Sequence, residues 1–100
     1  MNTQNKPLVL KLPAKLNLRS ATDSLTEGRK LAGQGDLQVD FSSVTEADSM
    51  ALALLLEWQQ VATASGHRLS VVALPESLLS LARLYGVLEL LPLDEQPAST

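Results

Sequence analysis

The sequence predicts an α/β fold, built as a small mixed β-sheet with helices mainly on one face, in the order β-β-α-β-α-β-α. Short apolar runs with strand periodicity alternate with longer segments of helical periodicity. The hydrophobic fraction is 45%, with aromatics only 3% and no isoleucine, and a leucine-built core favours helices on a modest sheet over an all-β sandwich. A chain of 100 residues fits one domain.

Two strands are expected first. Leu8, Leu10 and Leu12 alternate with other residues up to Pro13, and residues 15–19 alternate polar with apolar side chains. The short Pro13-Ala14 break between these runs predicts a tight hairpin.

A helix follows over residues 20–33. Ser20 or Thr22 can cap its amino end, and Gly33 can end it. Gly28 inside the helix costs about 1 kcal/mol relative to alanine, which predicts a short or imperfect helix.

The middle of the chain reads as a strand–helix–strand unit. Residues 37–41 alternate as a strand, 42–48 form a polar connector, and 49–65 form the longest helix. Residues 69–74 are almost continuously apolar, the pattern of a strand buried on both faces. The unit requires a parallel pair of strands joined by a right-handed crossover.

The last helix is expected over residues 76–85, after Pro75 and before Gly86. The apolar segment 87–93 could add a short turn or an edge strand.

A single domain is therefore predicted over residues 7–92, with 1–6 and 93–100 as flexible termini. The polar start does not read as a secretory signal, and no window supplies the ~18–20 apolar residues of a membrane span. A cytoplasmic location is expected.

Charge and composition exclude several functions. A net charge of −3 argues against nucleic-acid binding and against docking on anionic lipid through a basic patch. Without cysteine, the chain has no disulfide framework, thiolate nucleophile or cysteine-based zinc site.

No catalytic constellation is found, which predicts a non-enzyme without metal or cofactor. The one histidine, His67, lies in a turn sequence with no nucleophile candidate beside it. Residues 28–33 have the glycine interval of a phosphate loop but lack its Lys-Ser/Thr and fall within a helix. Glu46 and Asp48 are interpreted as solvated or capping carboxylates.

The longest helix has an unusual distribution of leucines. At 100° per residue, its core-facing arc holds Met50, Ala51, Leu54, Leu55, Trp58, Val61 and Ala62. Leu52, Ala53 and Leu56 fall instead on the solvent side, beside Ser49. Either the helix is rolled so that Leu52 and Leu56 pack at the sheet margin, or these residues form a docking patch.

The start of this helix also has two interpretations. Asp48 or Ser49 can act as an ordinary amino-terminal cap. Alternatively, the Ser49 hydroxyl can be phosphorylated, since the helix dipole favours a dianion there.

Two segments resemble STAS domains. Residues 39–56, VDFSSVTEADSMALALLL, resemble the family's strand, loop, Asp-Ser/Thr and leucine-rich helix. Residues 78–92, LLSLARLYGVLELLP, resemble the MlaB-like STAS subunits of the Gram-negative Mla phospholipid ABC transporters. Met50 and Ala51 stand where the general family has a small residue and glycine.

The resemblance implies a non-catalytic subunit that binds the cytoplasmic, MlaF-like ATPase of the transporter, and through it the permease and lipid-binding subunits, and supports outer-membrane lipid asymmetry. It places Asp48, Ser49, Leu52, Ala53 and Leu56 at the partner contact. The alternative is an anti-sigma factor antagonist switched by phosphorylation of Ser49. A domain of a sulfate transporter is a third possibility.

Overall fold

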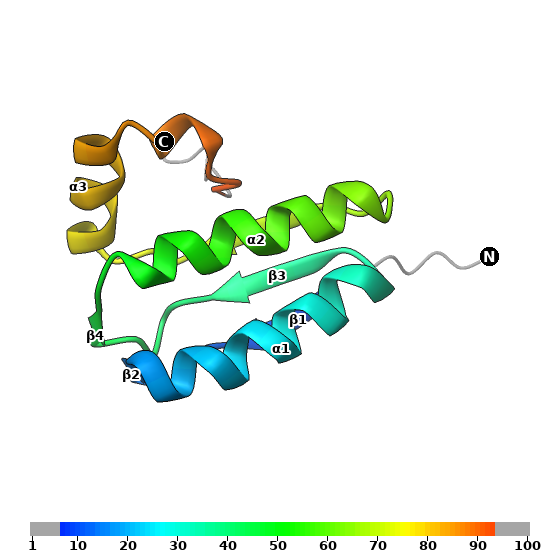
Figure 1. Ribbon diagram of the computed structural model, residues 1–100, viewed down its shortest axis with the longest axis horizontal. Helices are drawn as coiled ribbons and strands as arrows, with labels where there is room; N and C mark the ends of the chain where they lie inside the picture. Colours follow the sequence, from blue (N-terminus) through cyan, green and yellow to red (C-terminus); the bar gives the residue numbers. More distant parts are fainter. Residues whose placement is uncertain (1–6, 94–100) are drawn as a thin grey trace.

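The computed structural model describes residues 7–93 (Figure 1). The elements follow one another as β1 (Leu8–Lys11), β2 (Lys15–Leu16), α1 (Leu18–Gln34), β3 (Leu37–Asp40), β4 (Glu46–Ala47), α2 (Met50–Ala64), β5 (Leu69–Val72), α3 (Glu76–Tyr85) and a 3₁₀ turn η1 (Leu88–Leu90). The α/β class is confirmed.

The main sheet has three parallel strands in the order β1-β3-β5. Its register aligns Leu8, Leu37 and Leu69 in one row, and Leu10, Val39 and Val71 in another. Four of these six side chains, those from β3 and β5, are buried, which makes this face of the sheet the floor of the core. A bridge from Val71 to Leu93 continues the sheet beyond β5.

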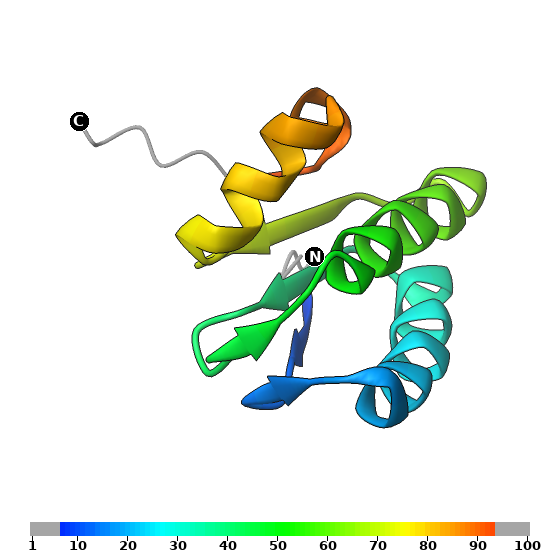
Figure 2. The same ribbon diagram turned by 60° about the vertical axis from the view of Figure 1, so that its left-hand side comes forward.

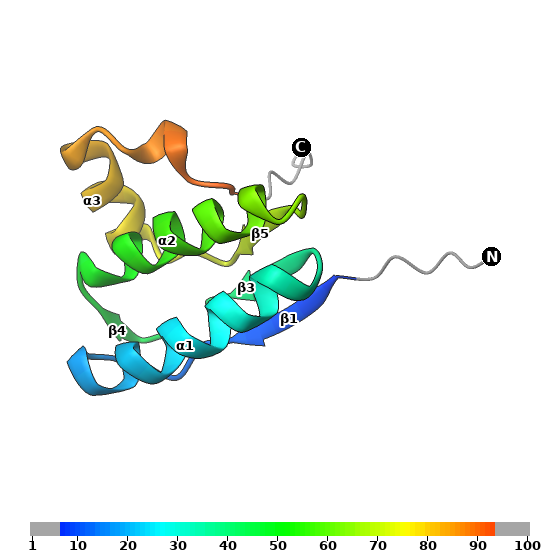
Figure 3. The same ribbon diagram turned by 45° about the vertical axis from the view of Figure 1, so that its right-hand side comes forward.

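Helices α1 and α2 lie side by side over the core face of the sheet (Figures 2 and 3). Helix α3 packs against α2, and its Leu78 and Ala82 are fully buried. The opposite face of the sheet carries Val9, Gln38 and Ser70, which stay exposed or partly exposed. Placement of the helices mainly on one face is confirmed.

Two details of the predicted sheet are wrong. All strand pairs among residues 7–93 are parallel, so the sheet is not mixed there, and the first two strands do not form a hairpin. Strand β2 instead pairs with β4, a two-residue strand within the predicted polar connector. The Ala14 carbonyl accepts from the Thr45 and Glu46 amides at 2.8 and 3.1 Å, and these contacts join the β2 and β4 segments at the start of their pairing.

The predicted burial of residues 69–74 on both faces is also wrong. Ser70 and Val72 of β5 are only half-buried, because no described helix covers their face of the sheet. At the carboxyl end, Leu93 forms an isolated parallel bridge with Val71. The predictions for residues 1–6 and 94–100 lie outside the described residues.

Helix α1 is longer than predicted: it begins at Leu18, and its N-cap is Asn17, not Ser20 or Thr22. The Asn17 side chain accepts from the Ser20 amide at 3.0 Å, and the Ser20 hydroxyl accepts from the Asn17 amide at 3.0 Å. This reciprocal capping box satisfies two amides at the start of the helix. Gly28 does not interrupt the helix, because the indole of Trp58 packs directly against it.

Candidate partner-binding surface

Asp48 and Ser49 form the amino end of α2. The Asp48 Oδ1 accepts from the Met50 amide at 2.9 Å, so Asp48 provides the side-chain cap. Ser49 has helical backbone angles (φ −61°, ψ −15°), and its hydroxyl makes no capping hydrogen bond. Both side chains are exposed. Asp48 therefore fixes the helix start, and the Ser49 hydroxyl faces solvent.

The solvent side of α2 is narrower than the helical wheel indicates. Ala53 is exposed and Leu56 is half-buried, but Leu52 is only 3% exposed and belongs to the core. The placement of Leu52 on the solvent side is therefore wrong, and the other interpretation, a helix rolled so that Leu52 packs inward, holds for this residue. Leu52 lies on the flank of α2 away from Glu57, which faces α1, and α3 packs against α2 near its amino end (Figure 1).

The outer ridge of α2, defined as Ser49, Ala53 and Leu56, stands on a rigid base. Leu55 and Trp58 beneath it are fully buried. The Trp58 Nε1 donates to the Leu25 carbonyl of α1 at 3.1 Å, so the indole is fixed by packing and by a hydrogen bond. A partner that contacts the outer ridge therefore meets a preformed surface.

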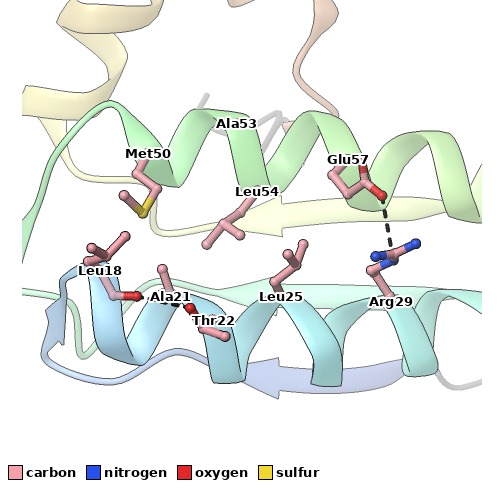
Figure 4. A pocket seen from close by; sticks show the side chains of 9 residues that line it. All are labelled: Leu18, Ala21, Thr22, Leu25, Arg29, Met50, Ala53, Leu54 and Glu57. Atoms are coloured by element: carbon pink, nitrogen blue, oxygen red, sulfur yellow. Dashed lines mark hydrogen bonds and ion pairs between the residues drawn. The ribbon is translucent and has the colours of Figure 1, made fainter.

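A groove of about 400 Å³ runs between α1 and α2 (Figure 4). Leu18, Ala21 and Leu25 line it from α1, and Met50, Ala53 and Leu54 line it from α2. One end is closed by an ion pair between Arg29 and Glu57, whose Nε and Oε2 atoms are 3.5 Å apart. The groove has no counterpart among the features predicted from the sequence. The spacing of Leu18 and Leu25, which are seven residues apart, could have indicated an apolar stripe on α1.

The remaining polar candidates have structural roles. His67 is half-buried, and its Nδ1 lies 3.2 Å from the Ala32 carbonyl, which ties the loop before β5 to the end of α1. The amide and hydroxyl of Ser42 bond to Asp40 and lower the pKa of that carboxyl. Residues 7–93 contain no group of three or more His, Cys, Asp or Glu side chains suited to a metal ion.

Comparison with known families identifies the fold and the family. The family described as "Mlab, STAS domain" matches residues 1–92. The chain belongs to the MlaB family of STAS domains. STAS domains are protein-interaction modules and are typically non-catalytic.

A solved structure supports the STAS fold. The anti-sigma factor antagonist SpoIIAA in its unphosphorylated form aligns with a TM-score of 0.72 and 12% identity, covering 99% of this chain and 89% of that chain. The predicted STAS-like fold is thus confirmed. No curated protein matches the sequence closely. None of the helices within residues 7–93 is long and apolar enough to cross a membrane.

Proposed function

We propose that this STAS domain is the non-catalytic subunit that binds the cytoplasmic, MlaF-like ATPase of a phospholipid ABC transporter and supports its assembly and activity. The observation that carries the proposal is the match to the MlaB family over residues 1–92. The permease and the lipid-binding subunits are contacted indirectly, through the ATPase. The transporter's role is to maintain outer-membrane lipid asymmetry.

The surface proposed for the ATPase is the outer ridge of α2 together with Asp48. Ser49 and Ala53 are small and exposed, so a partner can approach the helix backbone closely. Leu56 adds a half-buried apolar side chain at the carboxyl end of the ridge, and no charge on the ridge itself must be desolvated. Leu52 supports the ridge from within the core.

The proposed location is the cytoplasmic side of the inner membrane, reached through the ATPase and without direct insertion into lipid. The domain is proposed to act without catalysis and without a cofactor, so the isolated chain should not bind or hydrolyse ATP. Saturable ATP binding in calorimetry would contradict this part of the proposal.

Affinity purification from membranes solubilised in mild detergent tests the partner. An ABC ATPase with its permease should co-purify with the tagged chain. Recovery of a soluble kinase and no ATPase would contradict the transporter role.

Substitutions on the outer ridge test the surface. Ser49→Arg introduces steric bulk, and Leu56→Asp places an unpaired carboxylate at the contact. Both should abolish recovery of the ATPase while the circular dichroism spectrum stays that of the folded domain. Ser65→Arg, at the far end of α2 and also exposed, is the matched control and should bind like the wild type. Wild-type recovery with both ridge variants would refute the assignment of this surface.

The second candidate is a switch of the anti-sigma factor antagonist type, controlled by phosphorylation of Ser49. An exposed hydroxyl at the start of α2, free of a capping role, favours it. Intact mass measurement of protein from its native cells distinguishes the two functions. A population heavier by one phosphate, mapped to Ser49, supports the switch.

A further inference from the structure

Strand β1 lies at a free edge of the main sheet, beside α1 (Figure 3). The Leu8 and Leu12 amides donate toward β3, to carbonyls 2.8 and 3.1 Å away. Because backbone groups alternate in direction along a strand, the amides of Val9 and Lys11 point to the other side, where no described strand pairs with β1. Val9 is 56% exposed, so this side is open. An extended segment is the conformation that can pair with such an edge.

The edge is short, and it has two different faces. Pro7 and Pro13 flank β1 and have no amide N–H, so Val9 and Lys11 are the outward donors between them. The side chains of these two residues lie on the sheet face that no described helix covers, whereas Leu10 lies on the side of α1. An added strand therefore places its side chains alternately beside α1 and beside Val9 and Lys11.

A hollow of about 390 Å³ lies between β1 and α1, on the helix side of this edge. Leu10 and Pro13 form its apolar part, and the exposed carboxylates of Asp23 and Glu27 line it from α1. Among the described residues neither carboxylate has an ion-pair partner, and the lining contains no lysine or arginine. Ser24, only 8% exposed, also lines the hollow, and its hydroxyl makes no hydrogen bond within the described residues. The hollow thus suits a long cationic side chain, whose stem packs on the apolar part while its charged end reaches the carboxylates.

The spacing of the two carboxylates matches an extended segment. Asp23 and Glu27 are four residues apart, which is roughly 6 Å along a helix. Alternate side chains of a strand are roughly 6.6 Å apart, so two cationic residues at alternate positions can each meet one carboxylate. The intervening side chains lie beside Val9 and Lys11, where apolar side chains avoid repulsion from the lysine.

We propose that the free edge of β1 binds an extended segment of another protein, in which cationic residues alternate with apolar residues. The backbone of the segment pairs with Val9 and Lys11, and its cationic side chains face Asp23 and Glu27. This surface shares no residue with the outer ridge of α2, so the inference goes beyond the proposed function and does not depend on it.

Calorimetry of the full chain with blocked hexapeptides tests the proposed segment. A peptide in which lysine alternates with valine should bind. An isomer with three lysines before three valines has the same charge and composition, and should bind at least about tenfold more weakly. In two further alternating peptides, N-methyl groups are placed on the valine amides or on the lysine amides. One of these two should lose binding and the other should keep it, because alternate amides of a strand face opposite sides.

Variants of the chain test the proposed edge and the hollow. Val9→Pro removes an outward amide at a position where an edge strand tolerates proline, and should weaken binding at least about tenfold. Val9→Thr keeps the amide and is the matched control, with a change of no more than about twofold. Asp23→Asn with Glu27→Gln should weaken binding at least about fivefold through loss of charge. Glu46→Gln with Glu89→Gln makes the same change on exposed residues outside the hollow, and should bind like the wild type.

Several results would overturn the inference: no binding of the alternating peptide at millimolar concentration, equal binding of the isomer, or equal effects of the two methylation patterns. Wild-type affinity in Val9→Pro, or in the variant without the hollow's carboxylates, would do the same. Sedimentation of the chain without peptide tests a second copy as the occupant, and a dimer that Val9→Pro abolishes would also overturn the inference. If Val9→Pro unfolds, the methylated peptides still decide whether the segment pairs through its backbone.

Discussion

Replacement of Gly28 by alanine tests the packing that joins α1 to α2. In a solvated helix this change stabilises the fold by about 1 kcal/mol, because alanine has the higher helix propensity. Here the new methyl group would lie closer than 3.0 Å to three atoms of the Trp58 indole. The indole is fully buried, so it cannot move into solvent to make room for the methyl group.

The expected loss of stability depends on the displacement of the Trp58 indole that the new methyl group requires. Overpacking a filled core costs about 1–3 kcal/mol. Displacement of the indole would also break the 3.1 Å hydrogen bond from Trp58 to the Leu25 carbonyl, which costs about 1–3 kcal/mol when the groups stay buried. After subtraction of the propensity gain, Gly28→Ala should lower the free energy of unfolding by about 1–5 kcal/mol.

Gly33→Ala is the matched control in the same helix. A methyl group at Gly33 would make only ordinary contacts, at 3.9 Å from Ser65 and 4.0 Å from Val61. This variant should raise the free energy of unfolding by about 0.5–1 kcal/mol in urea melts. Stabilisation of similar size in both variants would refute the packing of Trp58 against Gly28.

Three further predictions concern stability. Leu55→Ala should cost about 2–5 kcal/mol in urea melts, because Leu55 is fully buried; no measurable loss would mean that α2 is rolled differently. Asp48→Ala should cost about 1 kcal/mol through loss of the helix cap, whereas Ser49→Ala should be nearly neutral. Hydrogen bonds from Ser42 lower the pKa of Asp40 in the fold, so the carboxylate stabilises the protein above its ordinary pKa, and this contribution is lost as the pH falls through the lowered value. Asp40→Asn should therefore make acid unfolding less steep below about pH 4, as followed by circular dichroism.

The predicted site was only partly recoverable from the sequence. Periodicity places Ser49, Ala53 and Leu56 on one side of α2, and the structure leaves the first two exposed. The same periodicity cannot show Leu52 to be buried, because its environment depends on α3, which arrives more than twenty residues later. The groove could not be predicted either, because its two walls come from separate helices. The distance between α1 and α2 cannot be inferred from the sequence of either helix alone.

Local chemistry in the sequence determined the three helices and the main-sheet strands β1, β3 and β5, whereas β4 lies in a segment that was predicted to be a polar connector. Alternating apolar residues, capping side chains and glycines act over a few residues, so they can be recognised without knowledge of the fold. Only the tertiary structure decided how these segments pair. Strands as short as β2 can satisfy their hydrogen bonds in a hairpin or in a parallel pair, and the packing of α1 and α2 on one face of the sheet selected β4 as the partner of β2. From the sequence, Gly28 only weakens its helix. In the packed structure, the absence of a side chain at Gly28 leaves the space that the Trp58 indole occupies.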